Sequence, residues 1–163
     1  MNRWIGLGII ICLTWASEAT AQLPALILKD INGRPVDVSR WNRKGTPVIL
    51  TFFATWCKPC LRELNAIRDV YPDWQEETGV ELVAVSIDRG QDVAKVKPLA
   101  DTEGWDYTIL LDSENALKQA LGVRSVPRIF ILDGKGHIMD DHLGYGIGTE
   151  TEIIEKIREL NAK

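Results

Sequence analysis

Three continuous apolar runs stand out in the pattern of hydrophobic and polar positions along the chain. They cover residues 47–54 (PVILTFFA), 80–87 (VELVAVSI) and 128–132 (RIFIL), and each is rich in β-branched or aromatic side chains. Runs of about four to eight such residues are typical of buried strands. We therefore predict three strands here, and the first is long enough to be central in a sheet.

Helical patterns alternate with these strands. Residues 58–78 are predicted to form a helix that Gly79 ends, because glycine readily adopts the left-handed conformation that follows a helix. Residues 91–104 also look helical but contain Pro98, which should kink or divide the helix. A short helix is predicted over residues 113–121.

The closing helix is predicted to begin at Thr149, because Thr149 and Glu152 have the spacing of a capping box. Apolar side chains then recur on one side of this helix. They are Ile153, Ile154, Ile157 and Leu160.

Two hairpins are predicted near the ends of the domain. Residues 25–31 and 34–38 flank Asn32-Gly33, which is typical of a hairpin with a two-residue turn. Residues 136–142 follow the 128–132 strand after Gly134-Lys135 and are predicted to pair with it.

The predicted order is strand–helix–strand–helix–strand, with residues 107–111 as the third strand, followed by a hairpin and a helix. This alternation indicates an α/β fold with a mixed, largely parallel central sheet and helices on both faces. The chain shows no internal repeat or linker, so residues 22–163 are predicted to form one domain.

Residues 1–21 are predicted to be a cleavable signal peptide. Arg3 precedes an apolar run over residues 4–13, and Ala19-Thr20-Ala21 has the small-x-small pattern that favours cleavage before Gln22. The run is shorter than the roughly 20 residues that a membrane-spanning helix needs, so an uncleaved anchor is the weaker alternative. We therefore expect an exported, periplasmic or extracytoplasmic protein.

Charge and cysteine content narrow the function. The formal net charge is −4 and there is no basic stripe, which argues against nucleic acid as a partner. We also expect the protein to be a monomer. Of three cysteines, Cys12 lies in the signal segment, which leaves Cys57 and Cys60 as a C-x-x-C pair. A bridge across so short a loop stabilises a fold by only about 2 kcal/mol, so redox chemistry is the better explanation of the pair.

The position of the pair at the start of a helix favours thiolate chemistry. Unpaired backbone N–H groups and the helix dipole stabilise a negative charge there. Cys57 is predicted to be the exposed, low-pKa nucleophile, and Cys60 the thiol that resolves a mixed disulfide. Pro59 is tolerated in the first turn, and Trp56 is expected to form an apolar lip beside the pair.

Glu63 is the third predicted catalytic residue. At about 100° per residue, it falls within the apolar arc that includes Cys60, Leu64 and Ile67. A carboxyl group on a buried face has a raised pKa and can exchange protons with a neighbouring thiol. The alternative is an exposed glutamate that only complements the helix dipole.

The segment FFATWCKPC after an apolar strand, followed by LREL, resembles the thioredoxin superfamily and, more narrowly, the TlpA/ResA-like exported reductases. The resemblance covers nearly all of residues 22–163. It implies a thioredoxin-like fold with an N-terminal β-hairpin and a central helical insert. It also implies a thiol–disulfide oxidoreductase with the Cys57–Cys60 disulfide as its redox group and no other cofactor.

The resemblance also implies residue roles and partners. It supports proton exchange by Glu63 and places a cis-proline loop at Val126-Pro127, which would bind an extended client polypeptide. The client would be an exported protein with a disulfide, such as an apocytochrome c, and a membrane thiol relay would supply electrons. The residues expected to contact the client are Trp56, Lys58, Pro59, Val126, Pro127 and Arg128.

Three residues depart from the family patterns. Arg128 follows the proline where relatives commonly have a small polar residue, which favours acidic partners or narrows the groove. Asn65 stands where relatives often have proline. Thr51 occupies the position at which thioredoxins proper carry an acidic residue, which leaves Glu63 as the obvious acid.

Other functions fit less well. A zinc or copper site would need more ligands near the cysteines than His137 and His142 supply. A peroxidase would need an upstream proline and threonine that this segment lacks. An inert bridge, a disulfide-donating oxidase or isomerase, and a binding module with incidental cysteines remain the alternatives.

Overall fold

The computed structural model describes residues 22–162, so the predicted signal segment, residues 1–21, lies outside the described residues. The strands are β1 (Ile27–Asp30), β2 (Pro35–Asp37), β3 (Val48–Phe53), β4 (Glu81–Ser86), β5 (Thr108–Leu111), β6 (Arg128–Leu132) and β7 (Ile138–Leu143). The helices are η1 (Val38–Arg43), α1 (Lys58–Thr78), η2 (Gly90–Asp92), α2 (Val93–Glu103), α3 (Ala116–Ala120) and α4 (Thr149–Asn161). No helix within residues 22–162 is long and apolar enough to cross a membrane.

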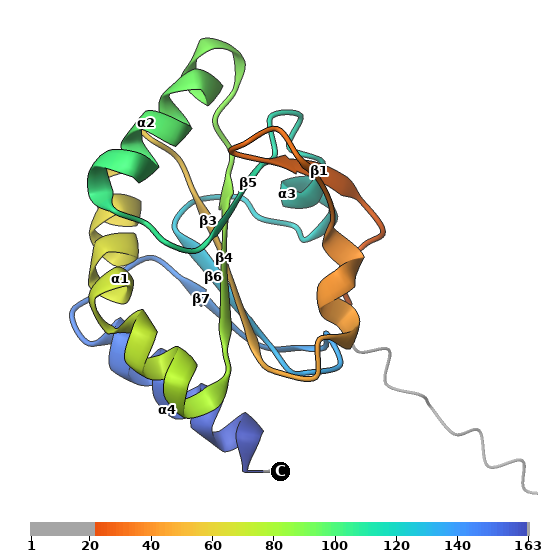
Figure 1. The fold of residues 1–163 in the computed structure, drawn as a ribbon, viewed down its shortest axis with the longest axis vertical. Coiled ribbons are helices and arrows are strands. Elements are labelled where there is room, and N and C mark those ends of the chain that lie inside the picture. Colours follow the sequence, from red (N-terminus) through yellow and green to blue (C-terminus); the bar gives the residue numbers. More distant parts are fainter. Residues whose placement is uncertain (1–21, 163) are drawn as a thin grey trace, which may run out of the picture.

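Within the described residues the strands form a single sheet with the order β2-β1-β5-β4-β3-β6-β7 (Figure 1). The pairs β3–β4 and β4–β5 are parallel, whereas β1–β2, β1–β5, β3–β6 and β6–β7 are antiparallel. The mixed sheet is confirmed, but "largely parallel" is wrong outside its centre. The physical reason is that each hairpin adds antiparallel strands to one edge.

The helices cover both faces of the sheet, as predicted. Figure 1 shows α1, α2 and α4 on one side and η1 and α3 on the other. Ile49 of β3 packs with α1 and α4 on the first face, and its neighbour Leu50 points into the core on the second. Adjacent side chains of a strand point to opposite faces, so β3 is buried on both.

The first hairpin has a longer turn than predicted. The N–H of Asp30 bonds to the carbonyl of Arg34, which leaves three residues in the loop instead of two. Gly33 adopts a positive φ of 79°, and the Asp30 side chain accepts hydrogen bonds from the N–H groups of Asn32 and Arg34. Local capping by the Asp30 side chain therefore favours the three-residue turn.

Two helix predictions were also wrong in detail. The capping box at Thr149 does not form, because Gly148 is the N-cap residue and the Thr149 hydroxyl bonds back to the carbonyl of Gly146. Of the two predicted effects of Pro98, division of the helix is wrong, because α2 runs continuously from Val93 to Glu103, and a kink stays a prediction. Pro98 lies on the exposed side of the helix, where water can satisfy the carbonyl that loses its partner.

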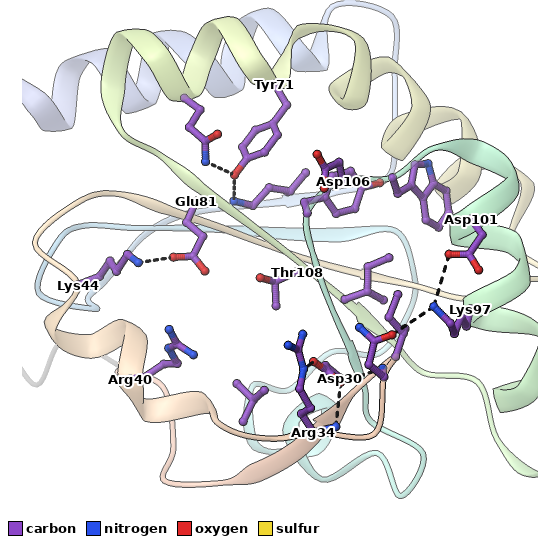
Figure 2. Close-up of a pocket in the computed structure, with 18 of the residues that line it drawn as sticks. Asp30, Arg34, Arg40, Lys44, Tyr71, Glu81, Lys97, Asp101, Asp106 and Thr108 are labelled. Atoms are coloured by element: carbon purple, nitrogen blue, oxygen red, sulfur yellow. Dashed lines mark hydrogen bonds and ion pairs between the residues drawn. The ribbon is translucent and has the colours of Figure 1, made fainter.

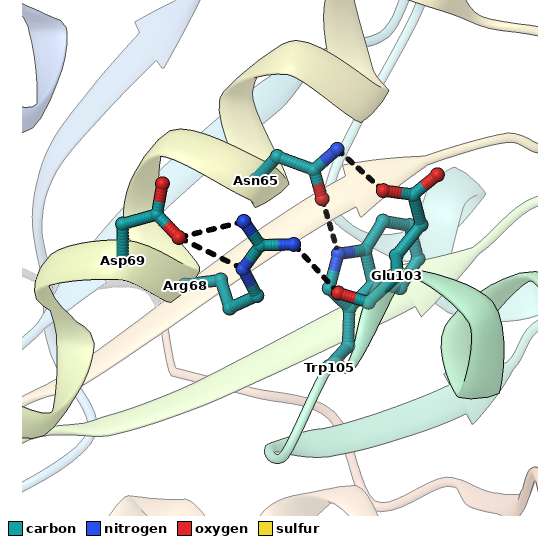
Figure 3. A network of polar contacts seen from close by, with 5 residues as sticks. All are labelled: Asn65, Arg68, Asp69, Glu103 and Trp105. Carbon is teal, nitrogen blue, oxygen red and sulfur yellow. Dashed lines mark hydrogen bonds and ion pairs between the residues drawn. The ribbon is translucent and has the colours of Figure 1, made fainter.

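Asn65 helps to hold the helical insert, which consists of η2 and α2 between β4 and β5, against α1 (Figure 3). Its amide donates to the Glu103 carboxylate at 2.7 Å, and its carbonyl oxygen accepts from the Trp105 indole at 2.7 Å. Arg68 donates to the Glu103 carbonyl at 2.6 Å. The Trp105 ring packs edge-on against Phe53 with ring centres 5.5 Å apart. The Asn65 side chain therefore ties the end of α2 to α1.

Replacing Asn65 with alanine should lower the free energy of unfolding by about 2 kcal/mol, because the partly buried Trp105 and Glu103 groups lose their partners. The better helix propensity of alanine offsets only about 0.5 kcal/mol of this loss. Urea unfolding of Asn65→Ala would measure the change, with Glu76→Ala on the exposed side of α1 as the control. Equal stabilities of the two variants would contradict this role of Asn65.

Candidate redox site

The junction between β3 and α1 positions both cysteines. The N–H of Cys57 bonds to the carbonyl of Ala54 at 3.0 Å, which closes a tight turn directly after the strand. Cys57 then acts as the N-cap residue of α1, and its sulfur accepts the N–H of Cys60 at 3.4 Å. The predicted helix start, with Pro59 in the first turn and Gly79 after the last, is confirmed.

Cys57 and Cys60 form a disulfide, with an S–S distance of 2.02 Å and a Cα–Cα distance of 5.3 Å. Cys57 is only 5% exposed, so the predicted exposure is wrong for this oxidised state; Cys60 is 0% exposed. The reason is that the disulfide and the bond from the Cys60 N–H hold the Cys57 sulfur over the first turn of α1. Cys57 is nevertheless the more accessible of the two.

The residues beside the pair differ in exposure. Trp56 is 64% exposed, Lys58 is exposed and Pro59 is half-buried. Trp56 also lines a hollow of about 360 Å³ that it shares with Asp92 and Lys95 from the start of the helical insert. The residue directly before Cys57 therefore exposes an aromatic side chain, and its role as an apolar lip stays a prediction.

The Val126-Pro127 peptide bond is cis, as predicted. Pro127 is buried, and its carbonyl accepts the N–H of Gly144 at 3.0 Å. Val126 packs against the core cluster that contains both cysteines. Arg128 forms an ion pair with Asp141 and lies over the Phe130 ring at 5.6 Å. The charge of Arg128 is therefore matched within the β6–β7 hairpin.

Glu63 is buried, as the helical arc predicts. It is 1% exposed, and its Oε1 accepts the hydroxyl of Thr51 at 2.8 Å, whereas Oε2 has no hydrogen-bond partner within residues 22–162. Burial raises the pKa of Glu63 to about 7, and the Thr51 hydrogen bond opposes this shift. Three positions separate Glu63 from Cys60 on the same helix, so the two side chains are neighbours. Glu63 can thus gain or lose a proton near neutral pH beside the buried thiol.

Thr51 and two tyrosines belong to the surroundings of Glu63, and sequence reasoning missed their contribution. Burial raises the pKa of Tyr107, and the charge of Glu63 raises it further. The pKa of Tyr145 is also raised, first by burial and then by Glu150 and Glu63. Thr51 was noticed only as a missing acid. Its position opposite Glu63 depends on how α1 packs on β3, which the sequence pattern does not reveal.

A larger hollow of about 880 Å³ lies at the other end of the sheet (Figure 2). Many of its charged side chains are paired with each other. The ion pairs are Arg34–Asp30, Lys44–Glu81 and Lys97–Asp101. The Tyr71 hydroxyl accepts the N–H of Leu82 at 3.1 Å, where β5 no longer accompanies β4. This hollow is separate from the cysteines and has no redox-active group.

Each of the two histidines lies beside an aspartate. His137 contacts Asp133 at 3.0 Å, and His142 contacts Asp140 at 3.2 Å, all in or next to the β6–β7 hairpin. In the part of the chain that the structure describes, no group of three or more His, Cys, Asp and Glu side chains could hold a metal ion.

A protein-family model described as the AhpC/TSA family matches residues 19–140. The chain belongs to the AhpC/TSA family. Thiol-disulfide oxidoreductase ResA of Geobacillus thermodenitrificans (strain NG80-2) is 33% identical over 137 residues, which cover 81% of this chain and 76% of ResA. The thioredoxin-like protein YneN of Bacillus subtilis (strain 168) is 35% identical over 124 residues, covering 76% of this chain and 70% of YneN.

The solution structure of an uncharacterized thioredoxin-like protein from Porphyromonas gingivalis is 55% identical to this AhpC/TSA-family chain. It matches with a TM-score of 0.75 and covers 86% of this chain and 92% of its own. The predicted thioredoxin-like fold and the ResA-like resemblance are therefore confirmed. Together with the Cys57–Cys60 pair, they identify this AhpC/TSA-family protein as a ResA-type thiol–disulfide oxidoreductase.

The raised pKa of Glu63 predicts how the stability of the oxidised protein depends on pH. The folded state holds the proton up to about pH 7, whereas the unfolded state releases it near 4.5. The stabilisation by the protonated Glu63 carboxyl is complete below the unfolded-state pKa of 4.5 and is lost as the pH rises through about 7. The free energy of unfolding should therefore fall by about 3 kcal/mol over this pH range. Glu63→Gln should remove the decline in chemical unfolding experiments, and Glu76→Gln should not. A decline that persists in Glu63→Gln would contradict the assignment.

Proposed function

We propose that this oxidoreductase reduces disulfides in exported proteins. The observation that carries the proposal is the Cys57–Cys60 disulfide at the start of α1, with the buried Glu63 carboxyl one turn further along the helix. This arrangement supplies a nucleophile, a resolving thiol and a proton acceptor in sequence order. The disulfide itself is the redox group, and no other cofactor takes part.

The first step is attack by the Cys57 thiolate of the reduced protein on one sulfur of a client disulfide. A bond forms between Cys57 and that sulfur, the client S–S bond breaks, and the other client sulfur leaves as a thiolate. The N-cap position stabilises the attacking thiolate, because the first-turn N–H groups and the helix dipole face it. The product is a mixed disulfide between Cys57 and the client.

The second step releases the client. Glu63 accepts the proton of the Cys60 thiol, and the Cys60 thiolate attacks the sulfur of Cys57. The Cys57–Cys60 disulfide forms, the second client sulfur leaves, and protonation yields two client thiols. Two electrons have passed from the cysteine pair to the client. With a pKa of about 7, Glu63 is suited to accept this proton near neutral pH.

Electrostatics around Cys60 supports the reducing direction. Once ionised, the Glu63 carboxylate repels a thiolate on the neighbouring cysteine and so disfavours the reduced pair. A less stable reduced form makes a cysteine pair a stronger reductant. Thr51 contributes by holding one carboxylate oxygen in place.

The client is proposed to bind as an extended polypeptide beside the cis-proline loop. The exposed Trp56 ring offers apolar contact, and the loop offers backbone groups. Lys58, Pro59, Val126, Pro127 and Arg128 complete the proposed surface. The Arg128–Asp141 pair would have to open before Arg128 could bind an acidic client.

Export is proposed from the signal pattern in residues 1–21. The protein would act as a monomer in the periplasm or an equivalent compartment and would receive electrons from a membrane thiol relay. Apocytochromes c, whose haem-attachment cysteines must be reduced, are the proposed clients.

Cys60→Ala should accumulate a mixed disulfide with a client protein, because the resolving thiol is missing. Non-reducing electrophoresis of the variant after incubation with a disulfide-containing apocytochrome c would detect the adduct. Cys57→Ala is the matched control and should form none. If Cys60→Ala forms no adduct and alkylation of Cys57 leaves client binding unchanged, the chain is a binding module.

The reduction potential of the Cys57–Cys60 pair should lie near or below about −250 mV, in the range of reducing thioredoxins. Equilibration with a thiol buffer would measure it, with Trp56 fluorescence as the reporter. A value of about −120 mV would mean that electrons flow from the client to this protein, which would then be a disulfide donor.

A further inference from the structure

A second buried carboxylate, Asp88, contacts the loop that carries the cysteines. Asp88 follows the end of β4 and is 1% exposed. Its Oδ1 accepts the Thr55 hydroxyl at 2.7 Å, and its Oδ2 accepts the Thr55 N–H at 3.0 Å. Oδ2 also accepts the hydroxyl of Ser86 at 2.8 Å. Both oxygens of this buried group are therefore occupied, and both bind Thr55.

Thr55 lies inside the turn that delivers Cys57 to the helix. The turn runs from Ala54 to Cys57 and is closed by their backbone hydrogen bond of 3.0 Å. The bonds to Asp88 fix Thr55 to the segment after β4, 33 positions further along the sequence. The direction in which β3 leads into α1 thus depends on a carboxylate outside the C-x-x-C motif.

We propose that Asp88 is a positioning residue for the redox pair, which it serves by holding the Thr55 turn and by placing a negative charge beside it. The inference rests on the proposed redox function of Cys57 and Cys60. Two consequences follow. The tether keeps Cys57 at the N-cap position, where its sulfur meets the N–H of Cys60. The charge disfavours a thiolate on Cys57 and shifts the pair toward the disulfide.

Asp88 takes part in none of the ion pairs found within residues 22–162. Lys95 of α2 pairs with Asp92 at 2.6 Å, and both line the hollow that Thr55 and Trp56 also line. The hydrogen bond to Asp92 is the main reason that the pKa of Lys95 is raised, and the charge of Asp88 adds to it. Because Asp92 already neutralises Lys95, the charge of Asp88 acts on the turn without a dedicated counter-ion.

The test measures the equilibrium between each protein and reduced and oxidised glutathione. Asp88→Asn keeps the size of the side chain but removes its charge, and we expect the equilibrium to shift about tenfold toward the dithiol, or about 30 mV. Asp112→Asn is the matched control. Asp112 is a fully buried carboxylate after the next strand, β5, and its side chain accepts the N–H groups of Leu117 and Lys118, which are not part of the cysteine loop. We expect no shift in that variant.

Thr55→Val separates the tether from the charge and tests the proposal independently should Asp88→Asn fail to fold. It keeps the carboxylate and the backbone bond but loses the hydroxyl bond. We expect the glutathione equilibrium to stay near that of the wild type while the rate of exchange falls about fivefold, the equivalent of one hydrogen bond. An unchanged rate in Thr55→Val would overturn the tether.

A folded Asp88→Asn protein with a wild-type equilibrium constant would overturn the effect of the charge. An equal shift in Asp112→Asn would do the same. Glutathione replaces the client in these measurements, so a wild-type protein that reduces no client protein would contradict the proposed function without affecting this inference.

Discussion

The direct passage from β3 into the first turn of α1 is the constraint on which the rest of the site depends. Burial on both faces fixes the position of β3, and the Ala54–Cys57 turn connects β3 directly to α1. Cys57 therefore becomes the N-cap residue, and Cys60 and Glu63 follow at fixed angles on the helix. The proposed roles of Cys57, Cys60 and Glu63 all depend on this one junction.

Burial of polar groups next to this junction determines the chemistry of the site. Glu63 and Asp88 are both almost fully buried, but their partners differ. One oxygen of Glu63 is paired with Thr51, which leaves the carboxyl free to change protonation near neutral pH. Both oxygens of Asp88 are held by Thr55 and a serine hydroxyl, which suits a structural tether. Two carboxyl groups of similar burial thus serve different purposes because their hydrogen bonds differ.

Contacts made by a few single residues hold the helical insert against the rest of the domain. Asn65 joins α1 to the end of the helical insert, and Trp105 carries that connection to Phe53 in β3. The insert in turn contributes Asp92 and Lys95 to the hollow beside Trp56. The surface next to the disulfide is therefore built partly by the insert, and the departure from proline at position 65 has a structural reason.

Most of the secondary-structure elements and the candidate reactive residues could be predicted from local patterns in the sequence. Apolar runs and the glycine after Thr78 fixed β3, β4 and α1 closely, because burial on both faces and helix termination leave strong local signals. The C-x-x-C pair and the apolar arc that contains Glu63 could also be recognised, because each is a matter of residue spacing in one short segment. The groups that surround these residues became known only from the folded arrangement of the elements. The hydrogen bonds of Thr51, Asp88 and Asn65 join residues that are distant in the chain, the hairpins made most pairings antiparallel, and the disulfide buried Cys57. Such choices depend on packing between elements, which no local pattern encodes.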